Sequence, residues 1–121
     1  MTVKAVDANW NLVETIIDTI GITSSDSSAS LPANAALVAG TKTFSVTLNK
    51  VGSTTLTARD LTDESKTSNT SPATTVGAGT PRKLTIQTLP SATAIAGVAF
   101  AQQPVIRVED SAGNLVPTNG L

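Results

Sequence analysis

Apolar and polar residues alternate along much of the chain. Residues 41–50 place Phe44, Val46 and Leu48 on one side and mostly threonine and serine on the other. Such alternation predicts half-buried strands of antiparallel sheets, because successive side chains of a strand point to opposite faces. Three more segments show it: residues 52–60, 82–90 and 104–110. The apolar positions predicted to form the core are Phe44, Val46, Leu48, Leu56, Leu84, Ile86, Ile106 and Val108.

Clusters of glycine, proline, asparagine, aspartate and serine separate these segments, as at residues 24–28, 49–53 and 77–81. Such clusters are typical of turns and loops. No stretch shows a helical repeat of apolar residues. Short strands separated by turns, without helices, predict an all-β fold built as an antiparallel β-sandwich.

One segment of the chain occurs twice. Residues 2–15 read TVKAVDANWNLVET, and residues 105–118 read VIRVEDSAGNLVPT. Asp110 lies 103 positions after Asp7, and the same offset relates the following Asn, Leu, Val and Thr. A fixed offset about the size of one small domain indicates a tandem array. The chain therefore spans slightly more than one period.

The segment that starts at Pro81 closely resembles the opening of the immunoglobulin-like (Big-type) repeats of large bacterial surface and secreted proteins. The shared features are a Lys-Leu strand, a proline, A-G-x-x-F, Q-P and V-x-V-x-D-x-x-G-N. Residues 24–60 resemble the middle and end of the same unit. The resemblance implies an Ig-like antiparallel β-sandwich of about seven strands, circularly out of phase with the repeat. It also implies a structural role as a stalk, spacer, adhesin or filament module, with an extracellular or cell-surface location.

The repeat boundary is predicted in the small, flexible segment 77–81, which ends in a proline. Residues 1–76 then supply the later strands (B to G type) of one repeat. Residues 82–121 supply the first strands (A and B type) of the next. We expect these two pieces to form one folded domain together, because 121 residues suit one core better than two.

Charge and composition exclude several classes of function. The net charge of −1 gives no field that would attract nucleic acid. No apolar stretch approaches the roughly 18 to 20 residues that span a bilayer, so membrane insertion is not expected. No signal peptide pattern is present, and an export signal is expected outside this fragment. Cysteine is absent, so a disulfide scaffold is excluded.

Catalysis finds little support in the sequence. Without His or Cys, the usual bases, nucleophile pairs and transition-metal ligands are missing, so neither an enzyme nor a cofactor is expected. Calcium needs six to eight converging oxygens, and no D-x-D-x-D spacing occurs. The acidic residues near loops are therefore interpreted as solvated: Asp7, Asp26, Asp60, Asp63, Glu64, Glu109 and Asp110.

Trp10 departs from the repeat. It stands where the second copy has Gly113, at a turn that favours a positive φ. Trp in that backbone would be strained by about 1–3 kcal/mol. Three interpretations stay open: a packed or interface residue, a tolerated surface residue, or an exposed contact for a glycan or a protein partner.

The duplicated strand raises a question of assembly, because a sandwich has one position for it. Ile106 and Val108 bury more apolar area than Val3 and Ala5, so we expect residues 104–118 to fill that position and pair with residues 41–76. The N-terminal copy would then lie at a sheet edge or enter another chain. A swapped dimer or a head-to-tail filament would result. The candidate interface residues are Val3, Ala5, Trp10, Ile106 and Val108.

Overall fold

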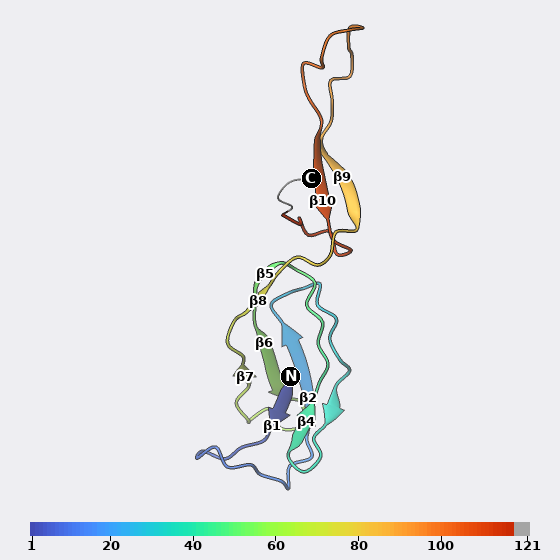
Figure 1. The fold of residues 1–121 in the computed structure, drawn as a ribbon. Coiled ribbons are helices and arrows are strands. Elements are labelled where there is room, and N and C mark those ends of the chain that lie inside the picture. Colours follow the sequence, from blue (N-terminus) through green and yellow to red (C-terminus); the bar gives the residue numbers. More distant parts are fainter. Residues whose placement is uncertain (118–121) are drawn as a thin grey trace. The chain divides into compact units, whose positions relative to one another are not determined.

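The computed structural model describes residues 1–117 and contains ten strands and no helix in that range (Figure 1). All paired strands are antiparallel, which confirms the predicted all-β class. The chain divides into two compact units, Met1–Val76 (unit 1) and Gly77–Leu121 (unit 2). This differs from the single domain expected from the sequence, because the strands of unit 2 pair with each other.

Unit 1 contains three antiparallel sheets. Their strand orders are β1-β4, β3-β2-β6-β7 and β5-β8. The strands are β1 (Thr2–Lys4), β2 (Thr19–Ser24), β3 (Ala35–Ala36), β4 (Thr41–Thr43), β5 (Gly52–Thr54), β6 (Leu56–Asp60), β7 (Asn69–Thr70) and β8 (Thr74–Val76).

The core of unit 1 lies between β1-β4 and the four-stranded sheet. Phe44 is 3% exposed, whereas Thr43 and Thr47 are exposed, so the predicted register of this segment is right. Val46, Leu48 and Leu56, also predicted to be buried, are half-buried. The buried cluster consists of Ile20, Ile22, Leu37, Phe44 and Ala58, with Val3, Ala5, Ile16, Ala35 and Val46 packed against it.

Strand β2 was not predicted, although it is the most buried strand of unit 1. Ile20 and Ile22 alternate with Thr19, Gly21 and Thr23, and the residue between the two isoleucines is buried as well. A Cβ added at Gly21 would meet Leu61 Cδ1 at 3.1 Å and Asn34 Oδ1 at 3.2 Å. β2 is therefore covered on both faces, and it pairs with β3 and β6 on its two edges.

The N-terminal copy of the duplicated strand pairs within unit 1. β1 pairs with β4, with Val3 opposite Lys42. The expectation that residues 104–118 pair with residues 41–76 is therefore wrong over the described range; Thr118 lies outside the described residues. The C-terminal copy instead pairs with β9, which is much nearer along the chain than residues 41–76, and the smaller closure entropy favours this pairing over the modest extra apolar area of the copy.

Unit 2 is built on one hairpin. β9 (Lys83–Thr88) pairs with β10 (Val105–Glu109), with Leu84 opposite Val108 and Ile86 opposite Ile106. The predicted burial of three of these residues is wrong: Leu84 is 69% exposed, Ile86 55% and Ile106 54%. Val108 is half-buried. A two-stranded hairpin has no second layer to cover its apolar face, which explains the exposure.

Candidate functional site

The two copies of the repeated segment form the same turn. In the first copy, Asp7 Oδ1 accepts hydrogen bonds from the backbone N–H groups of Asn9 and Asn11 at 2.8 and 2.9 Å. In the second, Asp110 Oδ1 accepts from the N–H groups of Ala112 and Asn114, both at 2.9 Å. In each copy the Asn side chain donates to the other Asp oxygen at 3.0 Å. The sequence repeat is thus a structural repeat.

The flanking backbone follows the same offset. Val13 N–H donates to Ala5 C=O at 2.9 Å, and Val116 N–H donates to Val108 C=O at 2.9 Å. An isolated bridge joins Val6 to Leu12 in the first copy, and its counterpart joins Glu109 to Leu115 in the second. β1 and β10 are therefore equivalent strands, each leading into an equivalent turn.

Several acidic residues are buried acceptors rather than the solvated side chains that the sequence suggested. Asp110 is 5% exposed. The Asn114 side chain, followed by the N–H groups of Gly79, Asn114 and Ala112, lowers the pKa of Asp110 to about 2. Glu109, also buried, lies 3.5 Å from Arg107 Nε. Asp7 stays exposed, and its hydrogen bonds from Asn11 and Asn9 lower its pKa.

Asp26 and Asp60 are buried in the same way, in unit 1. Asp26 Oδ2 accepts from the N–H groups of Asn49 and Lys50 at 2.9 and 3.0 Å. Asp60 Oδ1 accepts from the N–H groups of Thr62 and Asp63 at 2.9 and 3.0 Å. These carboxylates satisfy loop backbone groups. Within residues 1–117, no three His, Cys, Asp or Glu residues are grouped so as to hold a metal ion.

Trp10 adopts the backbone conformation that the turn demands. The φ of Trp10 is +64°, close to the +87° of Gly113, and Trp10 is 76% exposed. The expected strain is therefore present, and the interpretation of Trp10 as a side chain packed within the chain is wrong, whereas its interpretation as an interface residue stays open. Trp10 lines the edge of a groove in unit 1.

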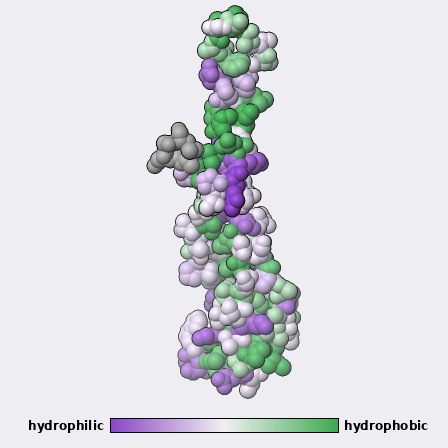
Figure 2. All heavy atoms as spheres, turned by 45° about the vertical axis from the view of Figure 1, so that its right-hand side comes forward, coloured by the Kyte–Doolittle hydropathy of each residue, from purple (hydrophilic) through white to green (hydrophobic). Residues whose placement is uncertain are grey.

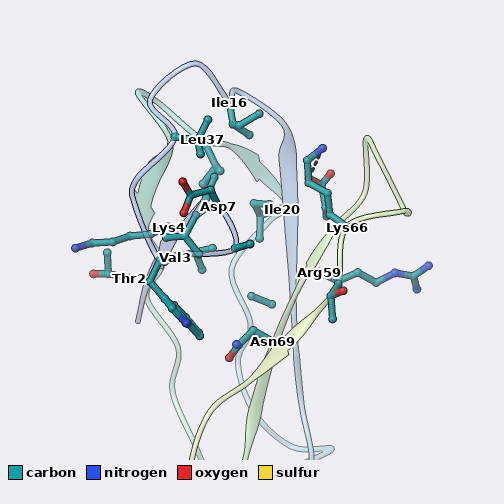
Figure 3. A pocket seen from close by; sticks show the side chains of 18 of the residues that line it. Thr2, Val3, Lys4, Asp7, Ile16, Ile20, Leu37, Arg59, Lys66 and Asn69 are labelled. Carbon is teal, nitrogen blue, oxygen red and sulfur yellow. Dashed lines mark ion pairs between the residues drawn. The ribbon is translucent and has the colours of Figure 1, made fainter.

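This groove, about 960 Å³ in volume, opens between β1 on one side and β6 and β7 on the other. Figure 3 shows Thr2, Val3 and Lys4 on one side and Arg59 and Lys66 on the opposite side. The apolar lining comes from β1, the following loop and the core: Val3, Ala5, Val13, Ile16, Ile20, Leu37 and Ala58. Part of the core of unit 1 is thus accessible from the groove.

Strand β1 has a free backbone edge along this groove. Met1 N and O both bond to Phe44, at 2.9 and 2.7 Å, and Ala5 N–H donates to Gly40 C=O at 2.8 Å. Alternate residues of a strand turn their backbone groups to opposite edges. The N–H and C=O groups of Thr2 and Lys4 therefore point away from β4, to an edge where no described strand lies.

Lys66 and Arg59, on the side of the groove opposite β1, form ion pairs. Lys66 Nζ lies 2.7 Å from Asp18, 2.8 Å from Asp63 and 3.6 Å from Asp60. The carboxylates of Asp18 and Asp63 raise the pKa of Lys66, with Asp18 contributing most. Hydrogen bonds from Lys66 first, and then from Ser65, lower the pKa of Asp63 to about 2. Arg59 pairs with Glu64 at 2.8 Å. Lys4 and Asp7 also line the groove, and neither forms an ion pair with another described residue.

Unit 2 presents apolar surface of its own, seen as green spheres in Figure 2. The exposed large apolar residues of this unit are Leu84, Ile86, Leu89, Ile95, Val98, Phe100, Val105, Ile106 and Leu115. For a unit of this size, so many exposed apolar side chains indicate an interaction surface.

The candidate interface residues thus divide between the units. The structure brings Val3, Ala5 and Trp10 together along the groove of unit 1, and places Ile106 and Val108 on the hairpin of unit 2. The groove residues Ile20, Leu37 and Lys66 were not predicted. They come from separate strands and loops, so no local sequence signal could have grouped them.

Known proteins offer no further guide. Comparisons of the chain with models of protein families, with curated proteins and with solved structures give no match. The described residues contain no helix long and apolar enough to cross a membrane.

Proposed function

We propose that the chain is a structural module of a tandem array, made of Ig-like β-sandwich repeats that act as a stalk, spacer or adhesin segment outside the cell. The observation that carries the proposal is the pair of equivalent turns at Asp7 and Asp110, with the same hydrogen bonds in both. The exposed apolar hairpin of unit 2 fits the start of a repeat whose remaining strands follow.

The composition agrees with a structural role. Thr occurs 20 times and Ser 12 times, and these side chains suit the solvent face of strands. The buried aspartates hold loops, and the chain has no His or Cys to act as a base or nucleophile. We therefore propose no catalytic activity and no cofactor.

A chain that completes the second repeat tests this proposal. Position 121 corresponds to position 18 by the offset, so the extended chain is residues 1–121 followed by residues 19–76. We expect a second cooperative domain, because Leu84, Ile86 and Ile106 would then be covered by an equivalent of the core of unit 1. Amide exchange in β9 should slow by at least about 100-fold, as expected when a marginal hairpin joins a stable domain.

The matched control is the same extended chain with Leu84→Asp and Ile86→Asp. It should keep the folding of residues 1–76 and lose the second domain. If β9 amides in the extended chain exchange as fast as in the original chain, the repeat organisation is wrong.

A second candidate function, a glycan- or protein-binding module, rests on Trp10 alone. An exposed Trp held at positive φ is an uncommon arrangement, and such outliers often occur at binding sites. Titration of Trp10 fluorescence with soluble glycans, with Trp10→Phe in a direct binding assay as the control, tests it. An unchanged emission spectrum with every glycan, together with equal capture of protein ligands by both forms, would remove this candidate.

A further inference from the structure

The free edge of β1 matches the edge by which β10 holds β9. In β10, the equivalents of Thr2 and Lys4 are Val105 and Arg107, and both lie opposite β9. We propose that β9 of a second copy of the chain pairs with the free edge of β1 and covers the groove of unit 1. This inference rests on the proposed repeat organisation and adds to it a specific partner and register.

The register follows from the offset that relates β1 to β10. Val108 lies opposite Leu84, Arg107 opposite Thr85 and Ile106 opposite Ile86. Subtracting the offset places Ala5 opposite Leu84, Lys4 opposite Thr85 and Val3 opposite Ile86. β9 would run antiparallel to β1, as it does to β10.

The side chains of β9 then meet the groove. Leu84 and Ile86 lie opposite Val108 and Ile106, on one face of the hairpin. Their counterparts Ala5 and Val3 pack against the buried cluster of unit 1. In the transferred register, Leu84 and Ile86 would therefore point toward the same core, into a groove lined by Ile20, Leu37 and Ala58.

The burial of apolar side chains favours the pairing of β9 with β1 of another copy over its pairing with β10. The backbone edge of β9 that pairs with β10 is the same edge that would pair with β1. β9 must therefore leave β10 before it can pair with β1. The backbone hydrogen bonds lost and gained are equivalent, because the two partner strands are equivalent. In the hairpin, however, Leu84 and Ile86 remain 69% and 55% exposed, whereas in the groove they would be covered. The ion pair lost, Lys83 with Glu109 at 3.9 Å, involves a largely exposed lysine and contributes little.

A second copy is a better donor than the same chain. The transferred register places Lys83 beside Val6, at the end of unit 1 where the loop after β1 lies. Figure 1 shows β5 and β8 at the opposite end of unit 1. The seven Cα–Cα steps from Val76 to Lys83 span at most about 25 Å. This only equals the roughly 25 Å of strand covered by residues 52–60, so the same chain could reach this register only if the segment were fully extended and made no turn. Donation from copy to copy is heterologous, so it builds an open head-to-tail filament unless the rotation between copies closes a ring.

Cysteine cross-linking between two single variants tests the register, because the natural chain contains no cysteine. A Lys4→Cys chain is mixed with a Thr85→Cys chain under mild oxidation. Paired strands place such residues about 5.5 Å apart between Cα atoms, within the range for a disulfide. The matched control is Gln87→Cys, two residues farther along β9 at the point where the pairing with β10 is irregular. We expect the Lys4–Thr85 heterodimer to form at least about 10-fold faster than the Lys4–Gln87 heterodimer.

A further variant checks that the apolar face drives docking. Leu84→Asp with Ile86→Asp, added to the Thr85→Cys chain, should reduce cross-linking to the level of the control. These side chains are mostly exposed in the hairpin, so unit 2 tolerates the change. Light scattering on the unmodified chain should show a mass that rises with concentration, and the Asp variant should remain a monomer.

Several outcomes would overturn the proposal. One is equal rates for the Thr85 and Gln87 variants. Another is a faster cross-link between Arg107→Cys and Thr41→Cys, which would place β10 rather than β9 in unit 1. A third is a disulfide that forms within a single Lys4→Cys, Thr85→Cys chain at high dilution, which would make the same chain the donor. In each case, slower amide hydrogen exchange in β9 of the extended chain would still support the proposed function.

Discussion

Truncation of Phe44 to alanine should be among the most damaging single changes in unit 1. Phe44 is 3% exposed and is the largest of the five buried apolar side chains. Its backbone also holds both hydrogen bonds to Met1 at the start of β1. The substitution removes a buried ring and leaves a cavity between the two sheets, which typically costs about 3–5 kcal/mol.

That loss is large compared with the stability of the unit. At about 0.05–0.15 kcal/mol per residue, the 76 residues of unit 1 have a free energy of unfolding of about 4–11 kcal/mol. Phe44→Ala should therefore remove about a quarter of it or more. Urea unfolding followed by far-ultraviolet circular dichroism measures the change; Trp10 fluorescence is a poor reporter, since Trp10 is 76% exposed in the folded chain.

The other phenylalanine provides a matched control. Phe100 lies in unit 2 and is 40% exposed, so Phe100→Ala should leave the unfolding of unit 1 unchanged. A loss of less than about 1 kcal/mol for Phe44→Ala would mean that the side chain is not part of a close-packed core. The assignment of the sheets around it would then be wrong.

Three further changes follow from the geometry. Gly40→Ala should destabilise unit 1 by at least about 2 kcal/mol in the same assay, because the φ of Gly40 is +69° and an added Cβ would overlap the Val13 carbonyl oxygen. As a control, Gly77→Ala should leave the stability of unit 1 unchanged, because a Cβ added at Gly77 meets no atom within 4 Å. Trp10→Gly should stabilise unit 1 by about 1 kcal/mol and raise its melting temperature by about 4–8 °C. The relief of backbone strain exceeds the cost of the extra conformational entropy that glycine gives the unfolded chain. An unchanged or lower melting temperature would contradict this. The pKa values of Asp63 and Asp110 are lowered to about 2 from an ordinary 3.8, so their contribution is complete above the ordinary value and is lost as the pH falls toward 2. Thermal unfolding between pH 7 and pH 2 should show a plateau down to about pH 5 and then a decline; a rise in stability below pH 4 would reverse the sign of the argument.

The sequence by itself determined the strands that have one covered face and the repeated turn. The alternation around Phe44 and Ala58 predicts which side chains face the core, because each of those strands has one apolar and one polar face. The Asp-x-x-x-Asn pattern at Asp7 and Asp110 predicts two equivalent turns, because the residues that make the turn lie within one short segment. Such local geometry needs no distant partner.

Only the tertiary structure decided the rest. β2 has only a short alternation, with Ile20 and Ile22 as its large apolar residues, and its burial on the other face depends on Leu61 and Asn34, which the fold brings against Gly21. Asp26, Asp60 and Asp110 look like solvated loop residues in the sequence, and their burial depends on which backbone N–H groups the fold brings to them. Which copy of the duplicated strand occupies unit 1 depended on pairing partners rather than on side-chain size, because β10 has β9 nearby and β1 has β4. The groove beside β1 joins residues from distant segments, and such a site exists only once the sheets have packed.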